Sequence, residues 1–215
     1  MLQAPAGARV LDVGCAFGFG TRILARTYAC TGIDSSAGFV RRARREVRSA
    51  RFAQAKAEAL PFRDATFDAA VCLEVIEHLG DERSAIQEIG RVLKPGGELV
   101  LSVPHRGLLE RWDSLNVYQR RTGRQLTFGE EPSASHWHRH YSAQQLSAVL
   151  DGFAIDRVER TGLGLAELLN LGLLAAKPRL YAGLAYLYFA AAAVEDELPL
   201  GRLAYNLMVH ARKAV

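Results

Sequence analysis

The chain has 215 residues, 49% of them hydrophobic and 23% charged, which is the composition of an ordinary globular protein. A chain of this length predicts one domain whose core needs no disulfide bonds. Its net charge of +4 is too small an excess to indicate a surface that binds nucleic acid. The opening residues, MLQAPAGARV, lack the basic start and apolar run of a signal peptide, so we expect a cytoplasmic protein.

The cysteines and the densest basic run both favour structural roles. The three cysteines are scattered along the chain: Cys15, Cys30 and Cys72. An odd number without metal-ligand spacing predicts buried, free thiols in a reducing compartment, with no metal site. The run RRARREVRSAR, residues 41–51, predicts the solvated face of a helix, because Val40, Ala43 and Val47 recur on the opposite face.

Strands and helices alternate through the first half of the chain. The sequence predicts strands at Arg9–Val13, Cys30–Asp34, Arg51–Ala55, Phe67–Val75 and Glu98–Pro104. Helices are expected between them, at Thr21–Tyr28, Gly38–Arg48 and Glu82–Leu93. This alternation predicts βαβ units with right-handed crossovers, and therefore a parallel sheet in an α/β fold.

The second half is organised differently. Residues 105–141 are mostly polar, have no sustained period, and predict an insertion over the active site. SAQQLSAVLDG predicts a helix with a serine cap and a glycine stop, and FAIDRVER predicts a strand. Within residues 162–197, two apolar helical stretches, Leu163–Ala176 and Leu180–Val194, precede a closing strand at Ala204–Lys213. We expect a single domain over residues 1–215, with its cofactor half at 8–104.

A glycine-rich bend follows the first strand, in VLDVGCAFGFGT. Glycines at 14, 18 and 20 allow a sharp turn and a close backbone approach. A dinucleotide-binding loop would need glycine at the positions of Ala16 and Phe19, and no phosphate-loop G-K-S/T follows. Asp34 ends the next strand, 20 residues after Gly14, where its carboxylate can accept both hydroxyls of a ribose. The alternative is that Asp34 only caps the following helix.

Five motifs occur in order: VLDVGCAFGFGT, GIDSS, AEALPF, FDAAVCLEVIEHL and LKPGGELVLSVP. Their order and spacing resemble those of class I S-adenosylmethionine-dependent methyltransferases, in a small-molecule branch similar to the ubiquinone and menaquinone methyltransferases. The resemblance is dense from Val10 to Val103 and looser to the final strand. It implies a Rossmann-like three-layer sandwich, in which a seven-stranded, mostly parallel sheet has its last strand antiparallel. It also implies S-adenosyl-L-methionine, converted to S-adenosyl-L-homocysteine, at the carboxyl ends of the strands.

The same resemblance implies the cofactor contacts: Asp12, Gly14, Cys15, Gly18, Asp34, Ser35, Ala57, Glu58 and Leu73. The first four would face the methionine and ribose, Asp34 would hold the ribose hydroxyls, and Ser35, Ala57 and Glu58 would border the adenine. Leu73 would lie under the sulfonium. Ala16 replaces the usual middle glycine, which a methyl group tolerates if φ is negative. Only nine residues precede Val10, where relatives usually have helices that help to close the pocket, so either the chain is trimmed or its own later segments close the pocket.

Histidines are the candidate catalytic residues. A hydroxyl or amine acceptor needs a base of near-neutral pKa. SHWHRHYS contributes His138 and His140, and His105 ends the fifth strand at the same edge, although loop packing is an equally open interpretation. No carboxylate or cysteine accompanies the histidines in sequence, so we expect no metal. For the Glu77–His78 pair we expect a local structural role.

The acceptor is predicted to be small and apolar, lipid-like compounds included, and methylated on oxygen. The Asn-Pro-Pro-aromatic and Pro-Cys motifs of DNA methyltransferases are absent, which argues against nucleic acid. The 15 uncharged residues 180–194 would form a helix of roughly 22 Å, against a hydrocarbon layer of roughly 30 Å. We therefore favour packing on the sheet or on a second subunit of a homodimer over membrane contact. The alternatives are a nicotinamide-dependent oxidoreductase and a non-catalytic binding module.

Overall fold

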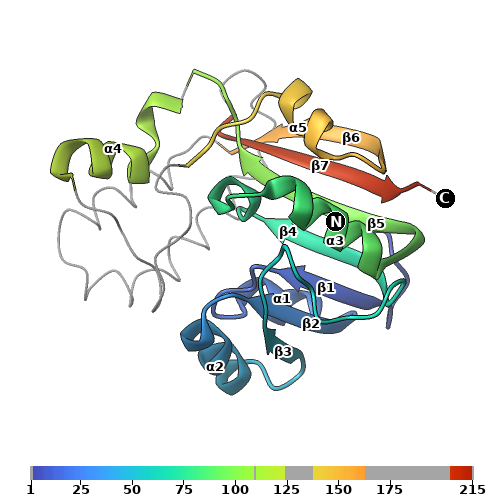
Figure 1. Cartoon of the computed structure of the whole chain (residues 1–215). Coiled ribbons are helices and arrows are strands. Elements are labelled where there is room, and N and C mark those ends of the chain that lie inside the picture. The colour runs from blue at the N-terminus through green and yellow to red at the C-terminus, as the bar shows by residue number, and fades with distance from the viewer. Residues whose placement is uncertain (1, 109, 124–137, 163–203, 215) are drawn as a thin grey trace.

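The computed structural model describes residues 2–108, 110–123, 138–162 and 204–214. Its strands form one seven-stranded sheet in the order β3-β2-β1-β4-β5-β7-β6 (Figure 1). The strands are β1 Arg9–Val13, β2 Ala29–Asp34, β3 Arg51–Gln54, β4 Phe67–Leu73, β5 Leu93–Pro104, β6 Phe153–Thr161 and β7 Asn206–Lys213. Strands β1 to β5 pair in parallel, and β7 pairs antiparallel with both β5 and β6. The predicted parallel sheet with an antiparallel last strand is confirmed.

The inner strand β1 is buried on both faces of the sheet. Leu11 and Val13 point into the larger hydrophobic cluster, where the helices α3 (Glu82–Val92) and α5 (Ala143–Val149) pack. Val10 points the opposite way, into the cluster that receives the end of α1 (Phe19–Leu24). Helices therefore cover both faces, as a three-layer sandwich requires.

The expected structural roles of the arginine run and the cysteines are confirmed. The helix α2 (Ala37–Glu46) begins at Ser36, whose hydroxyl accepts a hydrogen bond from Phe39 N. Val40 and Ala43 are buried, while the arginines of residues 41–46 lie on the opposite, more exposed face. All three cysteines are buried and free. The glycine bend starts α1 two residues earlier than predicted, because Gly18 in a left-handed conformation (φ 81°) provides its N-cap.

The insertion contains a helix that the absence of a sustained period did not predict. A short 3-10 helix, η2 (Glu110–Trp112), leads into α4 (Ser114–Thr122). The carboxylate of Asp113 accepts a hydrogen bond from Asn116 N and caps α4, and Gly123 (φ 63°) ends it. Both residues are ordinary start and stop signals, although the segment has no sustained hydrophobic period. Figure 1 shows α4 beyond the carboxyl ends of the parallel strands.

The two apolar stretches predicted as helices, residues 163–176 and 180–194, lie outside the described residues. Among the helices that the structure does describe, none has the length and apolar character needed to cross a lipid bilayer.

Candidate active site

The loop between β1 and α1 is held close to neighbouring elements. Gly14 N and Cys15 N both donate to Ile33 O, at 2.9 and 2.8 Å, which fastens the loop to β2. Gly14 has φ 74°, and a Cβ placed on it would lie 2.3 Å from Cγ2 of Val75. A side chain at position 14 would thus collide with the segment that follows β4. Only glycine therefore fits at position 14 of this loop.

Ala16 occupies the left-handed region, with φ 44°. The condition for tolerating its methyl group, a negative φ, is therefore not met. A left-handed conformation costs a non-glycine residue roughly 1–2 kcal/mol. The loop keeps this conformation because Ala16 N donates to the carboxylate of Asp34 at 3.0 Å.

Replacing Ala16 by glycine is expected to raise the free energy of unfolding by up to about 1 kcal/mol, since relief of the strain outweighs the added freedom of the unfolded chain. Chemical denaturation of the wild type and the variant measures this change in the free energy of unfolding. Ala148→Gly, in the helical backbone of α5, is the matched control and should lose about 1 kcal/mol. A loss of similar size at both positions would contradict the strain assigned to Ala16.

Asp34 ends β2 with its carboxylate fixed from two sides. One oxygen accepts from Ala16 N at 3.0 Å, and the other accepts from Ser36 N at 2.8 Å. Burial raises the pKa of Asp34, and these two hydrogen bonds oppose the shift. Ser36 rather than Asp34 caps α2, so the alternative role of Asp34 as a helix cap is wrong. Each oxygen retains a further lone pair, and the side chain is only partly buried.

Asp12 lies beneath the loop, in β1. Its carboxylate accepts a 2.5 Å hydrogen bond from the Thr21 hydroxyl, while burial raises its pKa to about 6. The neighbouring Cys15 packs its side chain among the apolar residues of α2 and β3, so only its backbone can face a ligand.

The remaining predicted cofactor residues lie around the same edge of the sheet. Ser35 is exposed, and its carbonyl accepts from the side chain of Gln54 at 2.9 Å. Ala57 is buried and Glu58 is half-buried. Leu73, the last residue of β4, is 42% exposed and therefore presents an apolar surface beside the loop.

The histidines of the insertion reach the site through a short extended segment, residues 138–141. Tyr141 N donates to Pro104 O at 2.9 Å, which places this segment at the carboxyl end of β5. His138 and His140, two residues apart, both approach Asp113. The third candidate, His105, is not in this cluster, because its Nδ1 lies 3.2 Å from Ala204 O.

Asp113 is the residue that the sequence interpretation missed. Its side chain is fully buried, and its Oδ2 lies 2.9 Å from His138 Nδ1 and 3.5 Å from His140 Nε2. The hydroxyl of Tyr205 donates to the same oxygen at 2.8 Å. Burial alone would raise the pKa of Asp113 and favour the neutral acid. The hydrogen bonds from His138, Asn116 N and Tyr205 outweigh burial and hold this pKa below its ordinary value. Burial also lowers the pKa of His140.

A carboxylate does therefore accompany the histidines, contrary to the sequence interpretation. Even so, within the described part of the chain no group of three or more histidine, cysteine or acidic side chains is arranged to hold a metal ion.

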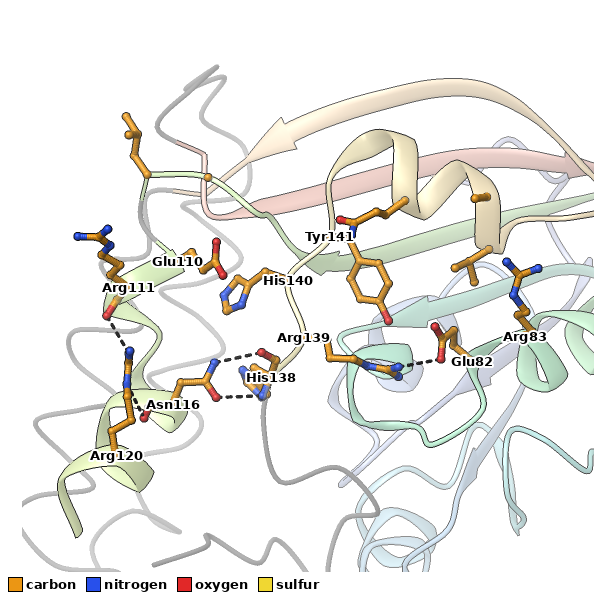
Figure 2. A pocket seen from close by; sticks show the side chains of 15 residues that line it. Glu82, Arg83, Glu110, Arg111, Asn116, Arg120, His138, Arg139, His140 and Tyr141 are labelled. Carbon is orange, nitrogen blue, oxygen red and sulfur yellow. Dashed lines mark hydrogen bonds and ion pairs between the residues drawn. The ribbon is translucent and has the colours of Figure 1, made fainter. Parts of the chain in front are cut away.

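A cavity of about 1370 Å³ opens beside this cluster (Figure 2). The start of α3, the η2–α4 segment, residues 138–141 and α5 line it. Its wall includes His138, of whose side chain 13% is exposed, and several arginines and carboxylates. Glu77 lies nearby but is fully buried, and burial raises its pKa well above the ordinary value.

The sequence and the fold of the chain are similar to those of known proteins. Residues 11–101 match the family model of a methyltransferase domain. The chain is 36% identical over 166 residues to the 2-methyl-6-phytyl-1,4-hydroquinone methyltransferase of a Synechocystis species, a match covering 74% of this chain and 47% of that protein. It is 38% identical over 107 residues to a ubiquinone biosynthesis O-methyltransferase of Xanthomonas oryzae, covering 47% and 45%.

Among solved structures, the [4+2]-cyclase SpnF superposes with a TM-score of 0.66 at 27% identity, over 98% of this chain and 76% of that one. The chain spans about half the length of the curated relatives it matches. The sequence motifs and the fold agree with these matches. The chain carries a methyltransferase domain at residues 11–101 and is similar to S-adenosylmethionine-dependent methyltransferases.

Proposed function

We propose that the protein binds S-adenosylmethionine and transfers its methyl group to a hydroxyl oxygen of a small, apolar acceptor. The observation that carries the proposal is the carboxylate of Asp34, oriented by Ala16 N and Ser36 N at the edge where the glycine loop turns. A carboxylate with free lone pairs beside such a loop is suited to a ribose diol.

Bound S-adenosylmethionine supplies a methyl group on a positively charged sulfur, which is a good leaving group. The main task of the chain's own residues is then to bind the cofactor and the acceptor and to orient them for the transfer. Asp34 holds the ribose, the backbone of residues 14–18 follows the amino-acid portion, and Leu73 offers an apolar surface near the reacting sulfur. The histidines at the carboxyl edge are available to take a proton from the acceptor.

The relatives support the choice of acceptor. The Synechocystis relative is named for a phytyl hydroquinone and the Xanthomonas relative for O-methylation in ubiquinone biosynthesis. Hydroquinones and catechols, with or without a lipid tail, are therefore the acceptors to try first. We also propose that the protein acts in the cytoplasm and forms a homodimer. Nucleic acid is not among the proposed acceptors.

A second candidate is catalysis on the same fold without methyl transfer. It is favoured by the similarity to SpnF, which is described as a [4+2]-cyclase. A protein of this kind would convert an acceptor without producing S-adenosylhomocysteine from the cofactor.

Calorimetry with S-adenosylhomocysteine, and with NADH in a parallel titration, tests the proposal. We expect S-adenosylhomocysteine to bind and NADH to give no heat of binding. No binding of S-adenosylhomocysteine at millimolar concentration would end the proposal, and binding of NADH alone would support an oxidoreductase. Incubation with labelled S-adenosylmethionine and a panel of catechols and hydroquinones then separates the two candidates, since only methyl transfer labels the acceptor.

A further inference from the structure

We propose that Asp113 is a positioning residue that keeps the ring proton of His138 on Nδ1 and so leaves Nε2 to accept the proton of the acceptor hydroxyl. The inference rests on the proposed methyl transfer and narrows its candidate base to one histidine.

The position of Asp113 leaves its carboxylate little freedom. Asp113 caps α4, and its Oδ1 accepts from Asn116 N at 2.8 Å. Its Oδ2 accepts the hydroxyl of Tyr205 and lies 2.9 Å from His138 Nδ1. A carboxylate only accepts hydrogen bonds, so the proton between them belongs to Nδ1. In its neutral form, the ring of His138 then has its lone pair on Nε2.

The backbone of His138 is fastened to the same turn of α4. His138 N donates to the side-chain oxygen of Asn116 at 3.1 Å, and the amide nitrogen of Asn116 donates to His138 O at 3.0 Å (Figure 2). The ring is thus held by Asp113 and the backbone by Asn116, both at the N-terminal end of α4. Such double anchoring fixes the direction in which the imidazole points.

His140 is a weaker candidate for the base. It turns its Nε2 toward Asp113, at 3.5 Å, and only 3% of its side chain is exposed. His138 exposes 13% of its side chain, lines the cavity and turns Nδ1 to the carboxylate. The Nε2 of His138 is itself buried, although part of the side chain is exposed at the cavity. Binding of the acceptor must therefore uncover this nitrogen, and catalytic hydrogen bonds often form only in the complex with substrate.

A chain of contacts connects the cluster to the glycine loop. Val75 packs where a side chain on Gly14 would lie, and it directly precedes the 3-10 helix η1 (Ile76–His78). The ring of His78 contacts that of His138 edge-on, with centroids 4.6 Å apart. Burial lowers the pKa of His78 to about 3, so this ring stays neutral beside His138. The proposed base is therefore connected to the glycine loop through His78 and Val75.

The chemical step balances within this arrangement. The acceptor O–H proton passes to Nε2 of His138 while the oxygen forms its bond to the methyl carbon. The electron pair of the broken carbon–sulfur bond stays on sulfur, which becomes a neutral thioether. The imidazolium that forms lies against the carboxylate of Asp113, which stabilises the added charge. The titratable and charged groups facing His138 are Asp113, His78, His140, Tyr205 and Arg139.

The tautomer of His138 can be measured without an acceptor. Side-chain nitrogen NMR of the six histidines, with His138 assigned through His138→Gln, should show the Nδ1–H form in the wild type. Asp113→Asn keeps the helix cap but turns an N–H toward the ring, so the Nε2–H form should appear. Asp81→Asn, at the N-cap of α3, is the matched control and should leave the tautomer unchanged. An unchanged tautomer in Asp113→Asn would overturn the proposal.

Methyl transfer to two probes supplies the second measurement. Catechol must lose its proton during the reaction, whereas 4-nitrocatechol is largely ionised near neutral pH. Asp113→Asn and His138→Gln should lower kcat for catechol about a hundredfold and change that for 4-nitrocatechol far less. Equal losses on both probes would indicate a merely structural role and overturn the assignment.

Calorimetry with S-adenosylhomocysteine separates this inference from the proposed function. Both variants should keep wild-type affinity, because neither residue belongs to the cofactor loop. If the wild type itself does not bind, the proposed methyl transfer fails. If all three proteins bind but the tautomer and probe results are negative, only the role of Asp113 fails.

Discussion

Asp34→Ala is expected to weaken the binding of S-adenosylhomocysteine at least tenfold, which corresponds to about 1.4 kcal/mol. The physical reason is the loss of hydrogen bonds between a carboxylate and the ribose hydroxyls, each worth roughly 1.5–3 kcal/mol. Calorimetric titration of wild type and variant measures the change directly.

The same substitution also removes the acceptor for Ala16 N and Ser36 N, so the loop itself is affected. Thermal unfolding recorded in parallel shows whether the variant is folded at the temperature of the titration. Asp151→Ala, at an exposed position outside the site, is the control and should bind as the wild type does. An unchanged affinity in folded Asp34→Ala would refute the ribose assignment.

Asp12→Asn is expected to raise the free energy of unfolding at pH 7.5, by up to about 3 kcal/mol. Burial raises the pKa of Asp12 from 3.8 to about 6 in the folded protein, so the folded state binds its proton more tightly than the unfolded state. The stability this proton provides is complete below pH 3.8 and lost as the pH rises through about 6. Asparagine accepts the Thr21 hydroxyl without carrying the buried charge.

Urea denaturation at pH 4 and pH 7.5 tests the effect of Asp12. The variant should gain much less at pH 4, where the folded wild type is already protonated. Asp151→Asn, which removes an exposed charge, should change little at either pH. A gain of equal size at both pH values would argue against a raised pKa as the cause.

The cofactor half of the molecule could be predicted because its signals are local. A run of buried residues followed by glycines identifies a strand and a bend, and β1 was predicted with its observed bounds, Arg9–Val13. The position of Asp34 at the end of β2 followed from the alternation of strands and helices in the first half of the chain. The conformation of Ala16 did not follow, since its positive φ is imposed by the hydrogen bond to Asp34 rather than by its own preference.

The histidine cluster could be predicted only in part. The sequence places His138 and His140 close together, but their common partner comes from the start of α4 and another donor from Tyr205, just before β7. Tyr205 and Asp113 are 92 positions apart in the sequence. Hydrophobic periodicity predicts local helices and strands, and it cannot predict a contact at this separation. Asp113 could have been found as a helix cap, yet nothing in the sequence indicates that it also binds a histidine.

A crystal structure of the protein with S-adenosylhomocysteine tests the central claim most directly. We expect both ribose hydroxyls within hydrogen-bond distance of the Asp34 carboxylate, and the amino-acid portion along the backbone of residues 14–18. An Asp34 side chain directed away from the sugar, or a diphosphate in the glycine loop, would contradict the account.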